Sequence, residues 1–109
     1  MLPECRRGQV RTVASAVAAQ HSRSLQEHAR LFALLNIALA DCAIASWDCK
    51  YEFGYWRPIT AIRNGDMDGN DATAREASWT PLVDNPMHPE YPSGHSILAA
   101  TVATVIKAD

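Results

Sequence analysis

Two short segments of this sequence carry residue types that can bind a small anion and move a proton. The first holds Lys50 and Arg57, seven residues apart across an expected helix end, and the second is Ser93-Gly94-His95 at an expected helix start. The Ser93 hydroxyl, the Gly94 N–H and the positive end of that helix could face one oxyanion. The Arg57 guanidinium group could donate two parallel hydrogen bonds to the anion, and the Lys50 ammonium group could add a compact positive charge. His95 could then deliver or accept a proton.

Each of these residues also has a plainer interpretation when it is taken singly. Ser-Gly-His is more often a structural helix cap than a ligand site. A lysine near a helix end usually extends its ammonium group into water, and an isolated arginine is usually a surface charge. The case for a site therefore depends on the two segments occurring together.

Together the segments resemble two of the three signature motifs of the type 2 phosphatidic acid phosphatase and vanadium haloperoxidase superfamily. The motifs are Lys-x6-Arg-Pro, here Lys50 to Pro58, and Pro-Ser-Gly-His, here Pro92 to His95. The flanking text is similar too, with Ala29-Arg30-Leu31-Phe32, Trp56-Arg57-Pro58-Ile59-Thr60-Ala61-Ile62-Arg63, Trp79-Thr80-Pro81 and His88-Pro89-Glu90-Tyr91. The resemblance covers about residues 25–107, and it is to the soluble bacterial haloperoxidase-like branch.

The resemblance implies a role for each matched residue. Lys50, Arg57, Ser93 and Gly94 would bind the equatorial oxygens of vanadate or phosphate, and His95 would be the catalytic acid and base. The third family motif, Ser-Arg-x5-His, supplies the axial vanadium ligand or the phosphatase nucleophile. Residues 96–109 contain neither Arg nor His. We therefore expect a truncated chain that is inactive alone and holds no direct metal ligand.

Two further positions are candidates for the lining of the pocket. Trp47 lies one turn before Lys50 on the same helix face, where the family often has an aromatic side chain. His88 occupies a position that resembles a histidine of bromoperoxidases and a phenylalanine of chloroperoxidases. The alternatives are core packing for Trp47 and a loop surface for His88.

Three functional hypotheses follow. The first is a vanadium haloperoxidase-like protein with vanadate as cofactor and with hydrogen peroxide and halide as substrates. The second is a phosphatase of the same architecture, which would act on a phosphomonoester through a phosphohistidine and need no cofactor. The third is a non-catalytic remnant that serves as a helical interaction module.

The hydrophobic pattern predicts an all-α fold, as part of a helical bundle of the acid phosphatase/haloperoxidase type. Helices are expected at about 25–52, 58–63 and from a Ser93 cap to about Lys107, with a shorter one within 9–20 and a long loop at 64–92. Ser24 and Glu27 match a capping box at the start of the longest helix. We expect an N-terminal segment at 1–23, partly helical and ending in a polar break at 21–24, and an incomplete domain at 24–109.

The longest helix is apolar on most sides, which predicts burial by several neighbours and not a membrane span. The other elements look too few to cover it, so we expect exposed apolar surface and self-association through it. A net charge of −2 with no basic block makes nucleic acid an unlikely partner.

The remaining features of the sequence are weaker indications. Cys42 and Cys49 lie seven residues apart on one helix, about 10 Å along its axis, too far for a disulfide with each other. Arg6 and Arg7 precede a short Ala-rich run that only faintly resembles a signal peptide, so a cytoplasmic location is slightly favoured. Residues 64–71 resemble a calcium loop, but Arg75 stands where the acidic ligand belongs, which favours Gly/Asp turns.

Overall fold

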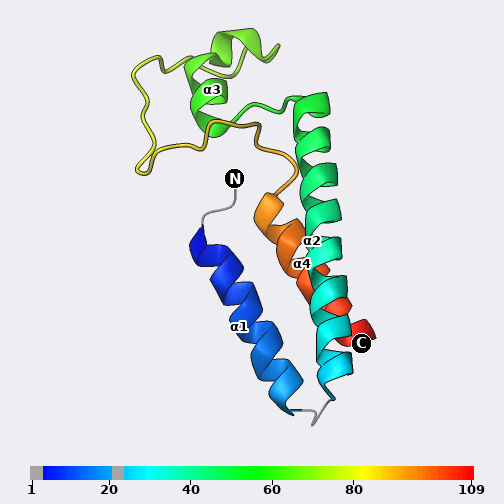
Figure 1. The fold of residues 1–109 in the computed structure, drawn as a ribbon. Coiled ribbons are helices and arrows are strands. Elements are labelled where there is room, and N and C mark those ends of the chain that lie inside the picture. The colour runs from blue at the N-terminus through cyan, green and yellow to red at the C-terminus, as the bar shows by residue number, and fades with distance from the viewer. Residues whose placement is uncertain (1–3, 21–23) are drawn as a thin grey trace. The chain divides into compact units, whose positions relative to one another are not determined.

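The computed structural model describes residues 4–20 and 24–109, with side chains from Gly8 onward in the first of these ranges. The elements are α1 (Glu4–Gln20), α2 (Leu25–Phe53), α3 (Pro58–Arg63), the short 3₁₀ helix η1 (Gly65–Met67) and α4 (Gly94–Ala108) (Figure 1). No strand occurs in these ranges, and the all-α prediction is confirmed. The break expected at 21–24 falls mainly outside the described residues, as do the side chains of Cys5, Arg6 and Arg7.

The start of α2 is fixed by the capping box that the sequence predicted. The Glu27 carboxylate accepts from the Ser24 backbone N–H at 2.7 Å and from the Ser24 hydroxyl at 2.8 Å. The Glu27 N–H in turn donates to the Ser24 hydroxyl oxygen at 3.3 Å. Two backbone donors that the first turn leaves without helical partners are thereby satisfied.

Gly54 ends α2 and lets the chain turn toward Arg57. Its N–H donates to the Lys50 carbonyl at 3.0 Å, and its φ of 57° lies in the left-handed region that favours glycine. Three residues later the Arg57 carbonyl accepts from the N–H groups of Thr60 and Ala61, each at 2.9 Å, and Pro58 stands at the first position of α3. Lys50 and Arg57 are thus held on the two sides of one glycine turn.

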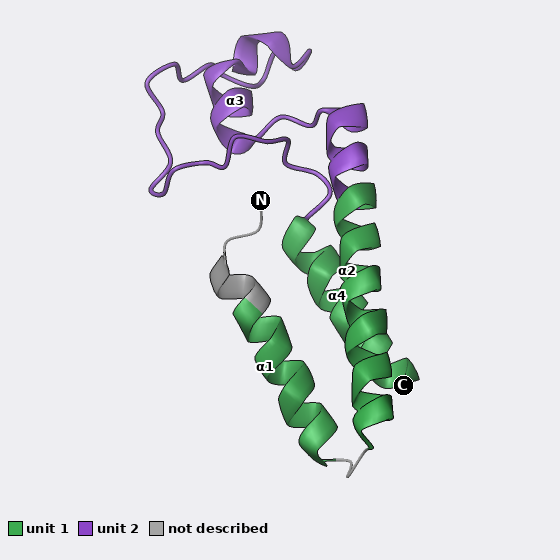
Figure 2. Ribbon diagram, viewed as in Figure 1, with its two compact units in different colours: residues 1–45, 94–109 green, residues 46–93 purple. Residues whose placement is uncertain are grey.

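The chain forms two compact units, residues 1–45 with 94–109 (unit 1) and residues 46–93 (unit 2) (Figure 2). In unit 1, α1 and α4 each run antiparallel to α2 (Figure 1). The Ala18 carbonyl contacts His28 Nε2 at 3.3 Å, and Arg30 pairs with Asp109 at 3.1 Å. Among the residues whose burial is described, the buried apolar side chains are Ala14, Ala18, Leu31 and Leu35.

The expectation that α2 is buried on most sides is wrong. Leu31 and Leu35 are each 1% exposed, but Ile37 and Ile44 are 60% and 70% exposed. The reason is that α1 and α4 cover only one side of the helix within unit 1. The apolar exposure predicted from the sequence is therefore present. The stretch Leu25–Arg63 is also long and apolar enough to cross a membrane by length and composition, a test that core helices of soluble proteins pass as well.

Unit 2 folds its long loop back onto α3 through backbone contacts. Arg63 Nε donates to the Trp79 carbonyl at 2.7 Å, and the Glu76 N–H donates to the Ile62 carbonyl at 3.0 Å. A Cβ on Gly65 would approach the Ala74 carbonyl oxygen to 3.0 Å, so the chain passes closely there. In the stretch that resembles a calcium loop, Arg75 pairs with Asp66 at 3.6 Å.

Candidate oxyanion site

Lys50 lies in the last turn of α2 and is 3% exposed. Its Nζ donates to the carbonyls of Pro89 and Glu90, at 2.8 and 3.1 Å. Burial lowers the pKa of Lys50, the nearby charge of Arg57 lowers it further, and Glu90 opposes the shift. Of the three ammonium N–H groups, two bind backbone oxygens, which leaves one for a ligand.

Arg57, at the start of α3, is anchored to the same stretch of loop. Its Nε donates to the His88 carbonyl at 2.6 Å, and its Nη2 lies 3.0 Å from His88 Nδ1. Its Nη1 pairs with the Glu90 carboxylate at 3.0 Å. The Nδ1 atom of His88 also lies 3.1 Å from the Pro89 carbonyl oxygen. It accepts from Arg57 when His88 carries its proton on Nε2, and it donates to Pro89 when the proton is on Nδ1.

Glu90 is the residue of this site that the sequence reasoning missed. Its carboxylate pairs with Arg57, its carbonyl accepts from Lys50, and its N–H donates to the Tyr55 carbonyl at 3.0 Å. The available signal was an acidic residue three positions before Ser93, within the loop expected to approach two cations. Loop positions have no periodicity that would have indicated which side chain faces inward.

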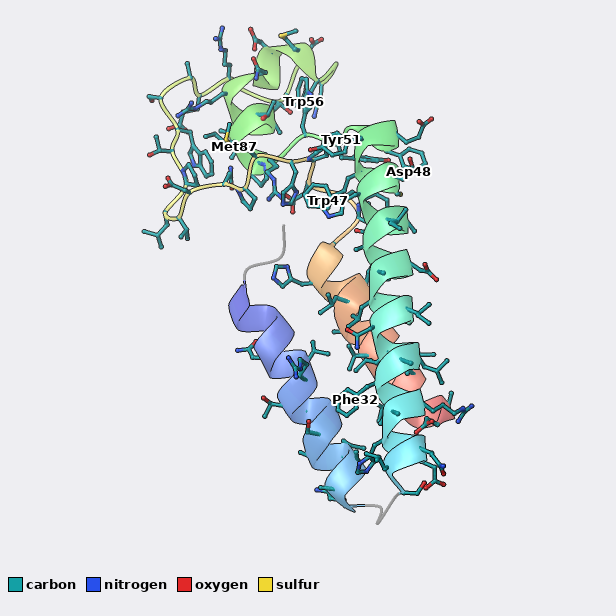
Figure 3. The ribbon with its side chains drawn as sticks, in the orientation of Figure 1. Phe32, Trp47, Asp48, Tyr51, Trp56 and Met87 are labelled. Atoms are coloured by element: carbon teal, nitrogen blue, oxygen red, sulfur yellow. The ribbon has the colours of Figure 1, made fainter. Side chains whose placement is uncertain are left out.

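Trp47 and His88, the two expected lining residues, touch each other. Their rings meet edge to face, with centroids 5.0 Å apart, and Trp47 also stacks on Tyr51 at 6.0 Å. Trp47 and Tyr51 leave the end of α2 on the side of the returning loop (Figure 3). Trp47 is 39% exposed, so it is not a core residue. The rings of Trp47 and His88 thus form an aromatic surface on the side of Arg57 where His88 contacts it.

The Pro-Ser-Gly-His segment spans the boundary between the two units. Ser93 is the last residue of unit 2 and follows a cis peptide bond between Tyr91 and Pro92. Gly94 and His95 are the first two residues of α4 in unit 1, and both are exposed. The predicted convergence of His95 with Lys50 and Arg57 stays a prediction.

An open cavity of about 750 Å³ adjoins Arg57 within unit 2. Its wall includes Arg63 and Thr60 of α3 together with Asp84 and His88 of the loop. The part of the chain that the structure describes places no group of three or more His, Cys, Asp or Glu side chains to hold a metal ion. Cys42 and Cys49 are free thiols, as expected.

The chemistry open to this arrangement is the binding of a small oxyanion through N–H groups. Arg57 has five N–H donors, and its contacts with His88 and Glu90 use one on each nitrogen, which leaves two. Lys50 adds its remaining donor and a second positive charge. The donor set therefore fits a small oxyanion that accepts charge-assisted hydrogen bonds.

Comparison with known proteins identifies related sequences. A family model described as the VCPO second helical-bundle domain matches residues 30–109. The vanadium chloroperoxidase of Curvularia inaequalis is 36% identical over 89 residues, an alignment that covers 74% of this chain and 14% of the relative. The chain thus spans about one-seventh of the length of that relative. No solved structure matches.

Proposed function

Because this chain belongs to the vanadium haloperoxidase superfamily, through its VCPO second helical-bundle domain, we propose that it forms the cationic part of a vanadate site. The activity proposed for the whole site is peroxide-dependent oxidation of halide. In this proposal, Lys50, Arg57, Ser93 and Gly94 hold the oxyanion and His95 moves protons. Peroxide activation is the chemistry that bound vanadate supplies.

The observation that carries the proposal is the common anchoring of the two motif cations. Lys50 belongs to α2 and Arg57 immediately precedes α3, yet both donate to the successive carbonyls of residues 88–90. That stretch leads within three residues to Ser93. Charged donors fixed in advance by backbone acceptors lose little freedom when an anion arrives, which favours binding.

Vanadate binding by the purified protein tests the proposal. Arg57→Ala should weaken vanadate binding by about 10- to 100-fold, because charge-assisted hydrogen bonds each contribute about 1.5–3 kcal/mol. Arg75→Ala is the matched control, since it removes the same charge from a residue that pairs with Asp66 instead. Titration calorimetry measures both affinities. An equal loss in the two variants, or unchanged binding by Arg57→Ala, would contradict the assignment.

The same preparations separate a haloperoxidase from a phosphatase. They are assayed for bromination of a phenol dye with vanadate and peroxide, and for hydrolysis of p-nitrophenyl phosphate. For the 109 residues alone we propose binding without turnover, because they contain no Ser-Arg-x5-His motif. A chain extended at its C-terminus with that motif serves as the positive control. Robust turnover by the unextended chain, lost on His95→Ala, would show that another residue fills the missing role.

A further inference from the structure

The carboxylate of Glu90 sits on the guanidinium group that the proposed function assigns to the oxyanion. The Arg57 Nη1 to Glu90 Oε2 distance is 3.0 Å, and the side chains are 16% and 50% exposed, respectively. The pair is therefore accessible to solvent and to ligand on the Glu90 side. The Glu90 carboxylate therefore already places a negative charge beside the proposed binding position of the oxyanion.

The main chain of Glu90 keeps that carboxylate in place. Its N–H donates to the Tyr55 carbonyl and its carbonyl accepts from Lys50 Nζ. The residue is tied at both ends to the segments that carry the two cations. An incoming anion must either share Arg57 with Glu90 or displace a side chain whose backbone stays fixed next to it.

The charge of Glu90 bears on the charge of a suitable ligand. Its carboxylate places one negative charge beside the two positive charges of Lys50 and Arg57. We infer that Glu90 makes this site select a monoanion over a dianion of the same tetrahedral shape. The inference rests on the proposed function, and it names a specificity determinant within that site.

This selection separates the two chemistries that the superfamily motifs leave open. Orthovanadate is mainly a monoanion at neutral pH, whereas a phosphomonoester is mainly a dianion. At the same position, Glu90 repels a dianion about twice as strongly as a monoanion, because the Coulomb energy is proportional to the charge of the ligand. Repulsion of that kind discriminates between ligands that fit equally well by shape.

The test compares vanadate with molybdate, which is a tetrahedral dianion at neutral pH, by titration calorimetry on the purified protein. Glu90→Gln keeps the side-chain shape and an oxygen acceptor for Arg57 but removes the charge. Vanadate affinity should rise by roughly 3-fold and molybdate affinity by roughly 10-fold, a modest change because the carboxylate is half exposed. Glu76→Gln, which removes one charge from an exposed loop residue of the same unit, should leave both affinities unchanged.

The outcomes separate the inference from the function on which it rests. If vanadate binds but Glu90→Gln changes both affinities by the same factor, or lowers them, charge selection by Glu90 is overturned and the proposed function stands. If neither the unchanged protein nor Glu90→Gln binds either anion, the proposed function fails, and the inference fails with it. Circular dichroism of each variant confirms that the helices are retained.

Discussion

At the scale of single residues, backbone oxygens hold the site together. Lys50 is nearly inaccessible, and its ammonium group is stabilised by the carbonyls of Pro89 and Glu90. These contacts compensate for part of the cost of burying a charge. They also tie the end of α2 to the loop that precedes Ser93. Lys50 thus has a structural role that is separable from ligand binding.

Lys50→Met should destabilise unit 2, because two backbone carbonyls lose a charged donor. The expected loss is about 1–3 kcal/mol in the free energy of unfolding. Lys107→Met, on an exposed residue of α4, should change it little. Denaturant titration followed both by tryptophan fluorescence, which reports on unit 2, and by far-ultraviolet circular dichroism, which reports mainly on unit 1, measures both. Equal effects of the two substitutions would show that Lys50 contributes nothing through its carbonyl contacts.

The pH dependence of that difference has a defined sign. Burial lowers the folded-state pKa of Lys50 below the ordinary 10.5. Between the lowered value and 10.5 the unfolded chain keeps a proton that the folded chain has released, so stability rises with pH in this window. The stability advantage of the unchanged protein over Lys50→Met should therefore grow as pH rises through the window.

At the scale of elements, the sequence predicted the positions of the helices well, but it did not predict which distant segments contact them. The capping box, Pro58 and Gly54 are local signals, and α2 and α3 begin and end within a residue of the expected positions. α1 begins at Glu4, earlier than the expected 9, because no cap or glycine-rich break marks its start. The contacts of Lys50 and Arg57 with residues 88–90 join segments more than thirty positions apart, and no local pattern encodes such pairings.

The need for glycine at position 54, in the turn between Lys50 and Arg57, can be tested by replacing two different glycines with alanine and comparing the results. Gly54→Ala should cost about 1 kcal/mol, because alanine is strained at a φ of 57° although nothing lies within 4 Å of the added methyl. Gly8→Ala, inside α1 and equally uncrowded, should instead stabilise the chain by about 0.5–1 kcal/mol. Thermal unfolding of the two variants should shift in opposite directions. A loss at both sites would contradict the conformational explanation.

At the scale of the whole molecule, few of the described apolar side chains are buried, and many large ones are exposed to solvent. Ile37 and Ile44 of α2 are largely exposed, and α4, although strongly apolar, has no buried residue. Exposed apolar helix faces mark surfaces that another element, another protein or a membrane covers. Self-association through these faces stays a prediction.

The exposed face of α2 should be detectable by a dye that binds apolar surface. Ile44→Glu should lower dye fluorescence and leave the helices intact, because the side chain is already 70% exposed. Leu35→Glu, on the buried side of the same helix, should cost more than about 4 kcal/mol and raise dye fluorescence by unfolding the chain. Sedimentation of the Ile44→Glu variant reports on self-association. Dye binding that is unchanged in Ile44→Glu would place the exposed apolar surface elsewhere.

The division into two units also divides the optical chromophores of the chain. All three tryptophans and all three tyrosines, Trp47, Tyr51, Tyr55, Trp56, Trp79 and Tyr91, lie within residues 46–93. Unit 1 has only Phe32 as an aromatic residue but contains α1, α4 and most of α2. Intrinsic fluorescence and near-ultraviolet dichroism therefore report on unit 2, whereas far-ultraviolet dichroism is dominated by unit 1. Fluorescence and far-ultraviolet dichroism recorded on one sample therefore follow unit 2 and unit 1 separately.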